Sequence, residues 1–318
     1  MKRIGTILLL ALLATGSGLL GVAQNAATIY SIEPGVSLLG AGGAGVSVIN
    51  GSETIYYNAA GLSELPGISF SSFYASYLGL ANYSSLALTF RNWGIAAMTL
   101  GSGGIQGYDA TGNPTETLAF RNSAIVFGIG MDPSDLPFIP TMGFDFSVGV
   151  KIKLLSASIG ATDGSGFGLD LGFRTTFGEL GLGGLSISDV ALGLSLVNLL
   201  GGVTYDAQSD NLGTDIQLGF SARIAGALLV ALDIHVGGGS IHAGVAYSPI
   251  PTLSLRAGMI AAGTTSFTLG LGVDVQGFLL DYAYVSHSLG GSHRVSLTLD
   301  FSSLDIAALS RSLRNILP

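Results

Sequence analysis

Apolar and polar side chains alternate along this sequence in one segment after another, each about ten residues long. In the clearest case, Phe146, Val148 and Ile152 fall on one face of an extended chain, while Lys151 and Lys153 fall on the other. Successive side chains of a β-strand point to opposite faces, so this alternation predicts strands with one apolar and one polar face. The pattern recurs in residues 166–177, 214–225, 264–274 and 292–301.

Composition favours a membrane protein over a soluble β protein. Apolar residues make up 48% of the chain, charged residues only 10%, and the mean hydropathy is +0.59. Yet no apolar run beyond the N-terminal residues reaches the ~18 residues of a membrane-spanning helix. Repeated strands of ~9–12 residues instead match the crossing length of a transmembrane β-barrel whose apolar face meets lipid. The sequence therefore predicts an all-β fold, an antiparallel up-and-down barrel.

About fourteen such segments can be counted, an even number that suits a bacterial barrel with both ends in the periplasm. The first connection then lies outside the cell, and residues 102–118 and 199–213 are expected to be long outer loops. We place the transmembrane barrel at residues 67–301 and expect no second folded domain. The predicted strands cover residues 67–78, 82–91, 93–102, 119–130, 142–154, 166–177, 189–199, 214–225, 227–236, 240–248, 252–261, 264–274, 277–287 and 292–301.

The first residues have the pattern of an export signal. Lys2 and Arg3 precede an apolar run, and small residues at Gly21 and Ala23 suit a signal peptidase. We expect cleavage after Ala23, so that residues 1–23 are a signal peptide. The chain has no cysteine, which excludes a lipoprotein anchor and a disulfide framework. These features predict the outer membrane of a bacterial cell.

Residues 24–66 contain no alternating segment and are predicted to be an N-terminal plug inside the lumen. A glycine-rich stretch leads to a short helix, for which Ser52 is the expected N-cap and Gly61 the expected left-handed C-terminal residue. Because this unit precedes the first strand, it begins at the periplasmic end of the barrel. The 49 glycines suit a lumen whose wall must leave room for a plug. The residues expected to form the plug and gate are Gly42, Gly43, Tyr56, Tyr57, Asn58, Gly61 and Leu62.

The polar faces of the predicted strands carry charges of both signs. We expect these charges to pair across strands and with the plug, because buried charges need partners. A second interpretation is a polar lining beside a gated route. The candidate lumen charges are Asp145, Lys151, Lys153, Asp170, Arg174, Asp215, Arg223, Asp233, Arg256, Asp274, Asp281 and Arg294.

Residues 302–318 are expected to form a short amphipathic tail. Leu309, Leu313 and Ile316 recur at helical spacing, and Arg311 and Arg314 lie elsewhere on the helical wheel. Such a helix suits the membrane surface or the floor of the barrel.

The two ends of the mature chain resemble a known family. Gly42-Gly43-Ala44, followed by Tyr57-Asn58-Ala59-Ala60-Gly61-Leu62, resembles the N-terminal signature of FadL-like outer-membrane barrels, with Ala59 in place of the family's proline. The segment resembles PorV/PorQ-type barrels, several of which serve type IX secretion, more closely still, and residues 279–301 resemble that group's closing hairpin. The resemblance implies a fourteen-stranded barrel with an N-terminal plug.

Motifs for chemistry are weak, and we expect no enzyme, no cofactor and no metal site. Gly40, Gly42 and Gly45 satisfy G-x-G-x-x-G, but no βαβ unit surrounds them as a dinucleotide site requires. His235 and His242 are expected to be ordinary lumen-facing imidazoles. The acidic balance, a formal charge of -8, argues against nucleic acid as a partner.

Two classes of function remain open. One is a plugged channel for hydrophobic small molecules such as fatty acids, in contact with outer-membrane lipid and monomeric. The other is a non-transporting barrel that docks or escorts secreted proteins. An apolar lumen next to Tyr56 and Tyr57 would favour transport, whereas a lumen filled by glycines and salt bridges would favour docking.

Overall fold

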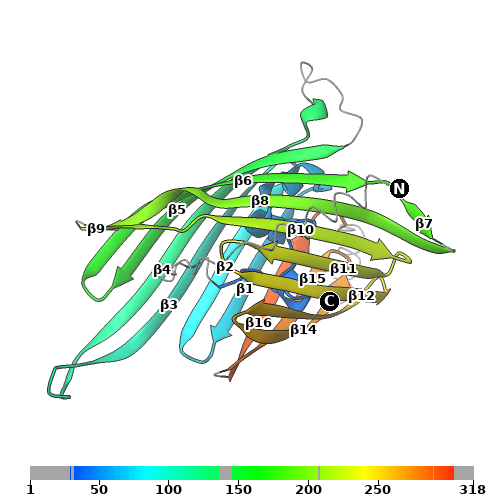
Figure 1. Ribbon diagram of the computed structural model, residues 1–318. Coiled ribbons are helices and arrows are strands. Elements are labelled where there is room, and N and C mark those ends of the chain that lie inside the picture. Colours follow the sequence, from blue (N-terminus) through cyan, green and yellow to red (C-terminus); the bar gives the residue numbers. More distant parts are fainter. Residues whose placement is uncertain are drawn as a thin grey trace, which may run out of the picture.

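The structure, a computed structural model, describes residue 29 and residues 32–135, 145–182, 184–206, 208–288 and 290–303. In this part of the chain an antiparallel sheet closes on itself as a barrel, with short helices inside it (Figure 1). None of the described helices is long and apolar enough to cross a membrane. The helices are α2 (Ser37–Gly40), η3 (Gly51–Glu53), α3 (Thr54–Tyr57), η4 (Ala59–Glu64) and η5 (Pro133–Asp135). The strands are β1 (Ser69–Tyr77), β2 (Ala81–Phe90), β3 (Trp93–Tyr108), β4 (Pro114–Met131), β5 (Phe146–Ile159), β6 (Thr162–Phe177), β7 (Leu180–Leu182), β8 (Leu185–Tyr205), β9 (Gln208–Asn211), β10 (Asp215–Ile224), β11 (Leu228–His235), β12 (Ser240–Ile250), β13 (Leu253–Ala262), β14 (Thr264–Val275), β15 (Phe278–His287) and β16 (Gly290–Asp300).

Fourteen of the strands close the barrel, which confirms the predicted fold class and strand count. β1 pairs with both β2 and β16, and β8 pairs with both β6 and β10, so the ring has no open edge. The two short strands β7 and β9 pair only with β8. Closure matters because an open sheet edge in lipid would leave backbone groups without partners.

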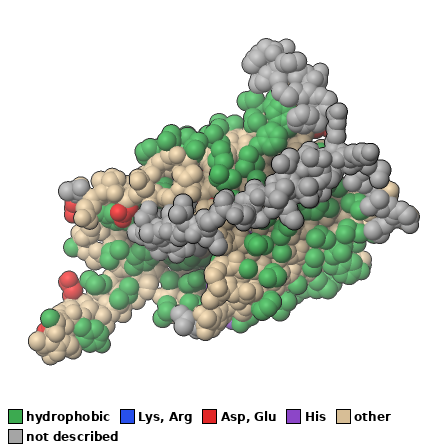
Figure 2. Space-filling view, in the orientation of Figure 1, with side chains coloured by type: hydrophobic (Ala, Val, Ile, Leu, Met, Phe, Trp, Pro, Cys, Tyr) green, Lys and Arg blue, Asp and Glu red, His purple; other side chains and the backbone are tan. Residues whose placement is uncertain are grey.

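The alternation in the sequence sets which face each residue takes. In β5, Val148, Val150 and Ile152 are 37%, 41% and 45% exposed, whereas the intervening Lys151 and Lys153 are 3% and 0% exposed. The exposed residues point outward, and Figure 2 shows hydrophobic side chains covering much of the outer wall in the view drawn. The apolar belt therefore lies outside and the polar faces point into the lumen.

The prediction of two long outer loops is wrong. β3 and β4 continue their ladder beyond the predicted strands, with Ile105 opposite Leu118 and Tyr108 opposite Pro114. β8 likewise runs to Tyr205 and is paired by β9. Residues at these hairpin ends face water on both sides, so their sequence does not alternate. Their backbone groups still pair, because ladder hydrogen bonds need no apolar face.

Residues 32–65, here called the N-terminal segment, lie against the inner face of the barrel wall. Hydrogen bonds join the segment to inward-facing side chains from β2 to β16, including Ser85, Asp233 and Thr268. The segment then enters β1 at Ser69. The expected signal peptide, residues 1–23, lies outside the described residues, as does the expected tail of residues 302–318 apart from its first two residues.

Candidate functional site

Inward-facing glycines of five strands receive the backbone of the N-terminal segment. A Cβ atom added at Gly244 would lie 2.0 Å from the carbonyl oxygen of Ala41, a distance that real Cβ atoms do not show. Any side chain at these positions would displace the segment, so glycine is needed for the close approach. The other four contacts join Gly130 to Ala59 O (2.4 Å), Gly149 to Ala60 N (2.3 Å), Gly193 to Val46 O (2.3 Å) and Gly258 to Gly42 N (2.4 Å), each measured from the added Cβ. We call these five residues the glycine seat.

A buried carboxylate shapes the first turn of the segment. The Glu53 side chain accepts hydrogen bonds from the backbone N–H groups of Val36, Ser37 and Leu38 at 2.7, 2.9 and 2.9 Å. Glu53 thereby satisfies the free donors at the start of α2, whose own N-cap residue makes no side-chain bond. Burial raises the pKa of the Glu53 carboxyl, against the opposing effect of these three donors. Glu53 was not among the expected plug residues.

The glycines and tyrosines expected in the plug lie within the segment. Gly42 and Gly43 both have positive φ values, +81° and +73°, and their N–H groups donate back to α2. The Tyr57 hydroxyl donates to the carbonyl oxygen of Pro34 at 3.0 Å, which ties two parts of the segment together. The hydroxyl of Tyr56 bonds that of Ser85 on β2. Tyr56 thus joins the segment to the barrel wall at β2.

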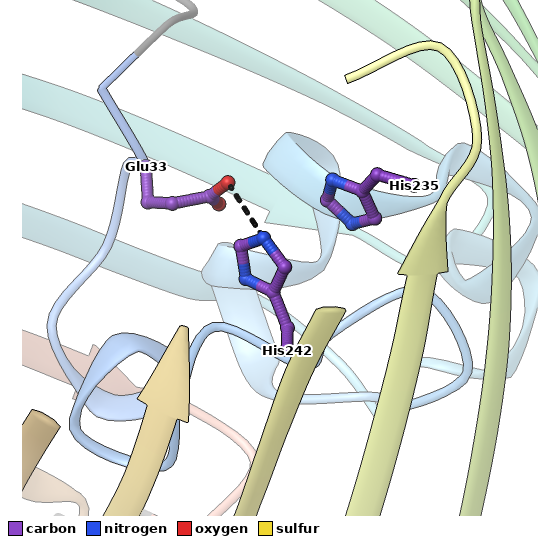
Figure 3. Close-up of side chains that lie close together, drawn as sticks. All are labelled: Glu33, His235 and His242. Atoms are coloured by element: carbon purple, nitrogen blue, oxygen red, sulfur yellow. Dashed lines mark ion pairs between the residues drawn. The ribbon is translucent and has the colours of Figure 1, made fainter. Parts of the chain in front are cut away.

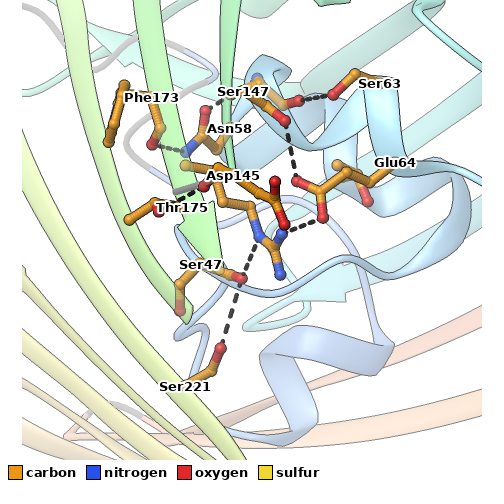
Figure 4. A network of polar contacts seen from close by, with 12 residues as sticks. Ser47, Asn58, Ser63, Glu64, Asp145, Ser147, Phe173, Thr175 and Ser221 are labelled. Carbon is orange, nitrogen blue, oxygen red and sulfur yellow. Dashed lines mark hydrogen bonds and ion pairs between the residues drawn. The ribbon is translucent and has the colours of Figure 1, made fainter. Parts of the chain in front are cut away.

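Asn58 connects the segment with itself and with β6. Its Oδ1 accepts from Ala60 N at 3.0 Å, while Nδ2 donates to the carbonyl oxygens of Val46 and Phe173 at 2.9 and 3.0 Å (Figure 4). Leu62 is fully buried, and its carbonyl oxygen accepts from the N–H of Asn92 in the β2–β3 turn. This places the last turn of the segment at the short-turn end of the barrel.

Two local expectations for this helix are wrong. Gly61 does not take a left-handed conformation; it lies within η4, and a Cβ there would meet Thr54 Cγ2 at 2.8 Å. Glycine is therefore required at this position by packing and not by handedness. Ser52 caps no helix, because the chain enters α3 directly from η3, and the cap residue Glu53 has helical dihedral angles.

Four of the predicted lumen charges bond the N-terminal segment directly. Arg174 pairs with Glu64 and donates from Nε to the carbonyl oxygen of Ser47 at 2.8 Å (Figure 4). Lys151 donates to the carbonyl oxygen of Tyr56 at 2.8 Å. On the other side of the lumen, Asp233 Oδ2 accepts from Val46 N at 2.9 Å, and Arg294 donates to the carbonyl oxygen of Glu33.

Other lumen charges pair with one another, either on neighbouring strands or across one intervening strand. Asp170 of β6 lies 3.1 Å from Lys151 Nζ and 2.6 Å from Lys153 Nζ of β5, and all three side chains are buried. Arg256 and Asp281 form a second pair at 2.6 Å. Such pairs satisfy charges that could not otherwise be buried.

The remaining four predicted lumen charges lie at strand ends. Asp215 accepts from Gly237 N at 2.6 Å in the β11–β12 turn, and Asp274 accepts from Gly277 N at 3.0 Å in the β14–β15 turn. Assignment to the lumen is wrong for Asp145, which is exposed just before β5, and for Arg223, which pairs with the exposed Asp189. Alternation assigns a residue to a face but not to a depth along the strand.

Strand register builds an apolar band on the lumen wall from β1 to β5. Phe73 of β1 lies opposite Ser85, and Met98 of β3 lies opposite both Ser85 and Ala124. The next row places Tyr83 opposite both Ala75 and Leu100. The residues of this apolar band, each at most 5% exposed, are Phe73, Ala75, Tyr83, Met98, Leu100, Ala124, Leu155 and Ala157.

The apolar band meets the N-terminal segment at its tyrosines. Tyr56 and Tyr57 belong to the same buried cluster as Phe73, Tyr83 and Met98. Phe73 and Tyr83 meet edge to face, with ring centroids 5.0 Å apart. The individual residues alternate correctly in the sequence, yet only the register shows that they form one surface.

One cluster among the described residues has the side chains to hold a metal ion. It consists of Glu33, His235 and His242, whose ligand atoms all lie within 4.8 Å of one another. The two histidines face the lumen as expected, but Glu33 was not predicted to join them. Glu33 is far from both histidines in the sequence, so no local pattern predicts this contact.

Comparison with known proteins identifies the fold. No protein-family model and no curated protein matches the chain. Among solved structures, the toluene transporter TodX of Pseudomonas putida matches with a TM-score of 0.52 and 14% identity, over 86% of this chain and 98% of that one. The toluene transporter TbuX of Ralstonia pickettii matches with a TM-score of 0.48 and 12% identity, over 83% and 96%. At such identity the likeness to TodX shows a shared barrel fold. It agrees with the FadL-like part of the resemblance, and the PorV/PorQ-type part stays a prediction.

Proposed function

We propose that this chain is a channel of the bacterial outer membrane for hydrophobic small molecules such as fatty acids. We further propose that its N-terminal segment is the plug, held at the periplasmic end. The apolar band carries the proposal. A water-filled pore is lined by polar side chains, whereas Phe73, Met98 and Leu155 present apolar surface to the lumen. Hydrophobic solutes would gain free energy from contact with such a surface.

The fold adds support of a coarser kind. TodX, whose name assigns it to toluene transport, has the same barrel fold. The proposed partners are a hydrophobic small molecule and outer-membrane lipid around a monomeric barrel. Export through a signal peptide of residues 1–23 is part of the proposal.

The glycine seat favours the second candidate function, a barrel that docks or escorts secreted proteins. A segment held by five close backbone contacts and by buried charges resembles a fixed filling more than a movable gate. The two functions differ in whether a path opens once the segment is gone.

Deletion of residues 40–60 separates the two functions. If the segment is the plug of a channel, the deletion raises uptake of a labelled fatty acid by cells, and conductance in planar bilayers. If the barrel is a docking protein, the deletion destabilises it without opening a path. A folded deletion variant, identified by heat-modifiable migration on gels, with unchanged uptake and conductance would rule out the plug.

A milder substitution tests the apolar band without removing the segment. Met98→Gln replaces an apolar side chain by a polar one of similar length, so uptake of the hydrophobic probe should fall severalfold. Thr89→Val is the matched control, because Thr89 also faces the lumen and is fully buried but lies outside the band. Equal uptake by both variants and the wild type would show that the band does not line the route.

A further inference from the structure

The cluster of Glu33, His235 and His242 brings together three groups that the proposed channel does not use. His235 ends β11, His242 is the third residue of β12, and Glu33 belongs to the N-terminal segment (Figure 3). His242 Nε2 lies 4.0 Å from Glu33 Oε1, and the two imidazole rings are stacked with centroids 4.3 Å apart. Both histidines are buried, at 7% and 2% exposed, whereas the Glu33 side chain is 26% exposed.

Hydrogen bonding determines which nitrogen of His242 carries the lone pair that can bind a ligand. Its Nδ1 lies 3.1 Å from the carbonyl oxygen of Gly42. A carbonyl oxygen can only accept, so Nδ1 carries the proton and donates. The lone pair is then on Nε2, which faces Glu33 and lies 3.1 Å from the Ser240 hydroxyl. This is the arrangement of a histidine that binds metal through one nitrogen while a carbonyl group orients the other.

His235 shows the same division between its two nitrogens. Its Nδ1 lies 3.9 Å from Asp215 Oδ2, a carboxylate that favours a proton on that nitrogen. Its Nε2 is buried without a hydrogen-bond partner among the described residues. A buried polar atom without a partner is costly, and a bound ion would remove that cost.

The charges around the cluster also favour a cation. Asp215 is the acidic neighbour along the wall, with its Oδ2 3.9 Å from His235 Nδ1. Arg294 donates to the backbone carbonyl oxygen of Glu33, which leaves that residue's carboxylate oriented toward His242.

From these contacts we propose that Glu33, His235 and His242 bind one divalent transition-metal ion, with Zn²⁺ as the best fit. Two imidazoles and one carboxylate form a known three-ligand set for zinc that leaves a fourth position open. Ligand atoms around tetrahedral zinc lie about 3.3 Å apart for bonds of ~2.0 Å. Side-chain rotations that shorten the present separations by about 1.5 Å would complete the site.

Such an ion would fasten the start of the N-terminal segment to the β11–β12 hairpin. Glu33 is the only ligand supplied by the segment, and both histidines belong to the wall. Metal binding would therefore oppose movement of the segment away from this hairpin.

Metal binding by the full chain in detergent tests the proposal. The protein should carry an affinity tag without histidines and be stripped with EDTA before titration with Zn²⁺ by calorimetry. We expect one ion per chain, and at least a tenfold loss of affinity in His235→Gln, His242→Gln and Glu33→Gln. His293→Gln is the matched control, since this histidine lies on the outer face beside Tyr282 and should leave the affinity unchanged.

A measurement on the wild type avoids dependence on the folding of variants. X-ray absorption of the zinc-loaded protein should show two imidazole nitrogens and a carboxylate oxygen in the first coordination shell. Absence of stoichiometric binding, wild-type affinity in His235→Gln and His242→Gln, or a loss of affinity in His293→Gln would overturn the proposal. The readout is independent of transport, so a failed metal site and a failed channel hypothesis are told apart.

Discussion

Two parts of the lumen wall treat the N-terminal segment differently. From β4 round to β16, glycines and charged side chains meet the segment's backbone, at contacts such as Gly244 with Ala41 and Arg174 with Ser47. From β1 to β5, the apolar band meets mainly the side chains of the segment. One of these, Tyr56, makes a hydroxyl contact with Ser85. The first part holds the segment by specific backbone contacts, and the second packs against it.

The difference teaches where a passage could open. Backbone contacts and buried ion pairs have strict geometric requirements, so they fix the position of the segment. Apolar packing is non-directional and tolerates exchange of one apolar partner for another. A hydrophobic molecule could therefore replace the segment's side chains along the apolar band while the glycine seat keeps its contacts.

The largest effect is expected for Asp170→Asn. The substitution removes the carboxylate shared by Lys151 and Lys153, leaving two buried ammonium groups without it, at a cost of ~3–5 kcal/mol. The midpoint of guanidinium unfolding should fall accordingly. Asp163→Asn, at an exposed position of the same strand, is the control and should change stability by less than ~0.5 kcal/mol. Similar shifts for both would mean that the ion pairs do not hold this part of the wall.

A smaller loss is expected for Gly244→Ala. The added methyl group would overlap the carbonyl oxygen of Ala41, so the segment or the strand must shift, at about 1–3 kcal/mol. Limited proteolysis should then cut the segment faster than in the wild type. Gly103→Ala is the matched control, because nothing lies within 4 Å of the added atom there. Unchanged protection of the segment in Gly244→Ala would contradict the role of the glycine seat.

Glu53→Gln should weaken the segment from within, by about 1–3 kcal/mol, because the amide nitrogen of glutamine cannot accept the hydrogen bond that one carboxylate oxygen accepts. The effect should also depend on pH. Since the pKa of Glu53 is raised in the folded state, the folded chain keeps a proton that the unfolded chain releases. Its contribution is complete below the ordinary pKa and is lost as pH rises through the raised one.

Thermal unfolding of the wild type and Glu53→Gln across a pH series measures this contribution. The stability advantage of the wild type should shrink from acidic to neutral pH. A constant difference across the series would show that Glu53 titrates alike in the folded and unfolded states.

The smallest effect is expected for Tyr56→Phe, which removes the hydroxyl contact with Ser85 and keeps the apolar ring. The loss should be about 0.5–1.5 kcal/mol in the same unfolding measurement. If Tyr56→Phe destabilised the protein as much as Asp170→Asn, the two parts of the wall would hold the segment equally and the comparison would fail.

The sequence predicts the barrel well because alternation is a local signal. β13, at Leu253–Ala262, lies within one residue of its predicted bounds, since its outward and inward faces meet different surroundings. The hairpin ends of β3 and β4 were missed because both their faces meet water. Asp145 and Arg223 were assigned to the lumen because alternation gives the face of a residue but not its depth along the strand.

The interior was harder to predict because its contacts join distant residues. The sequence indicates that glycines are plentiful, but not that Gly149 faces Ala60 while Gly103 faces open space. Glu33 shows no pattern of its own, and only the folded chain places it beside His242. Such contacts follow from register around the whole ring.

The same contacts have a consequence for the order of assembly. Thr268 donates to the carbonyl oxygen of Gly40, a residue 228 positions earlier in the chain. The N-terminal segment is synthesised first, yet its final partners include a strand that comes almost last. Contacts this far apart form late and slowly. The lumen would thus be filled only as β16 meets β1, so that closing the ring and seating the segment are a single step of biogenesis.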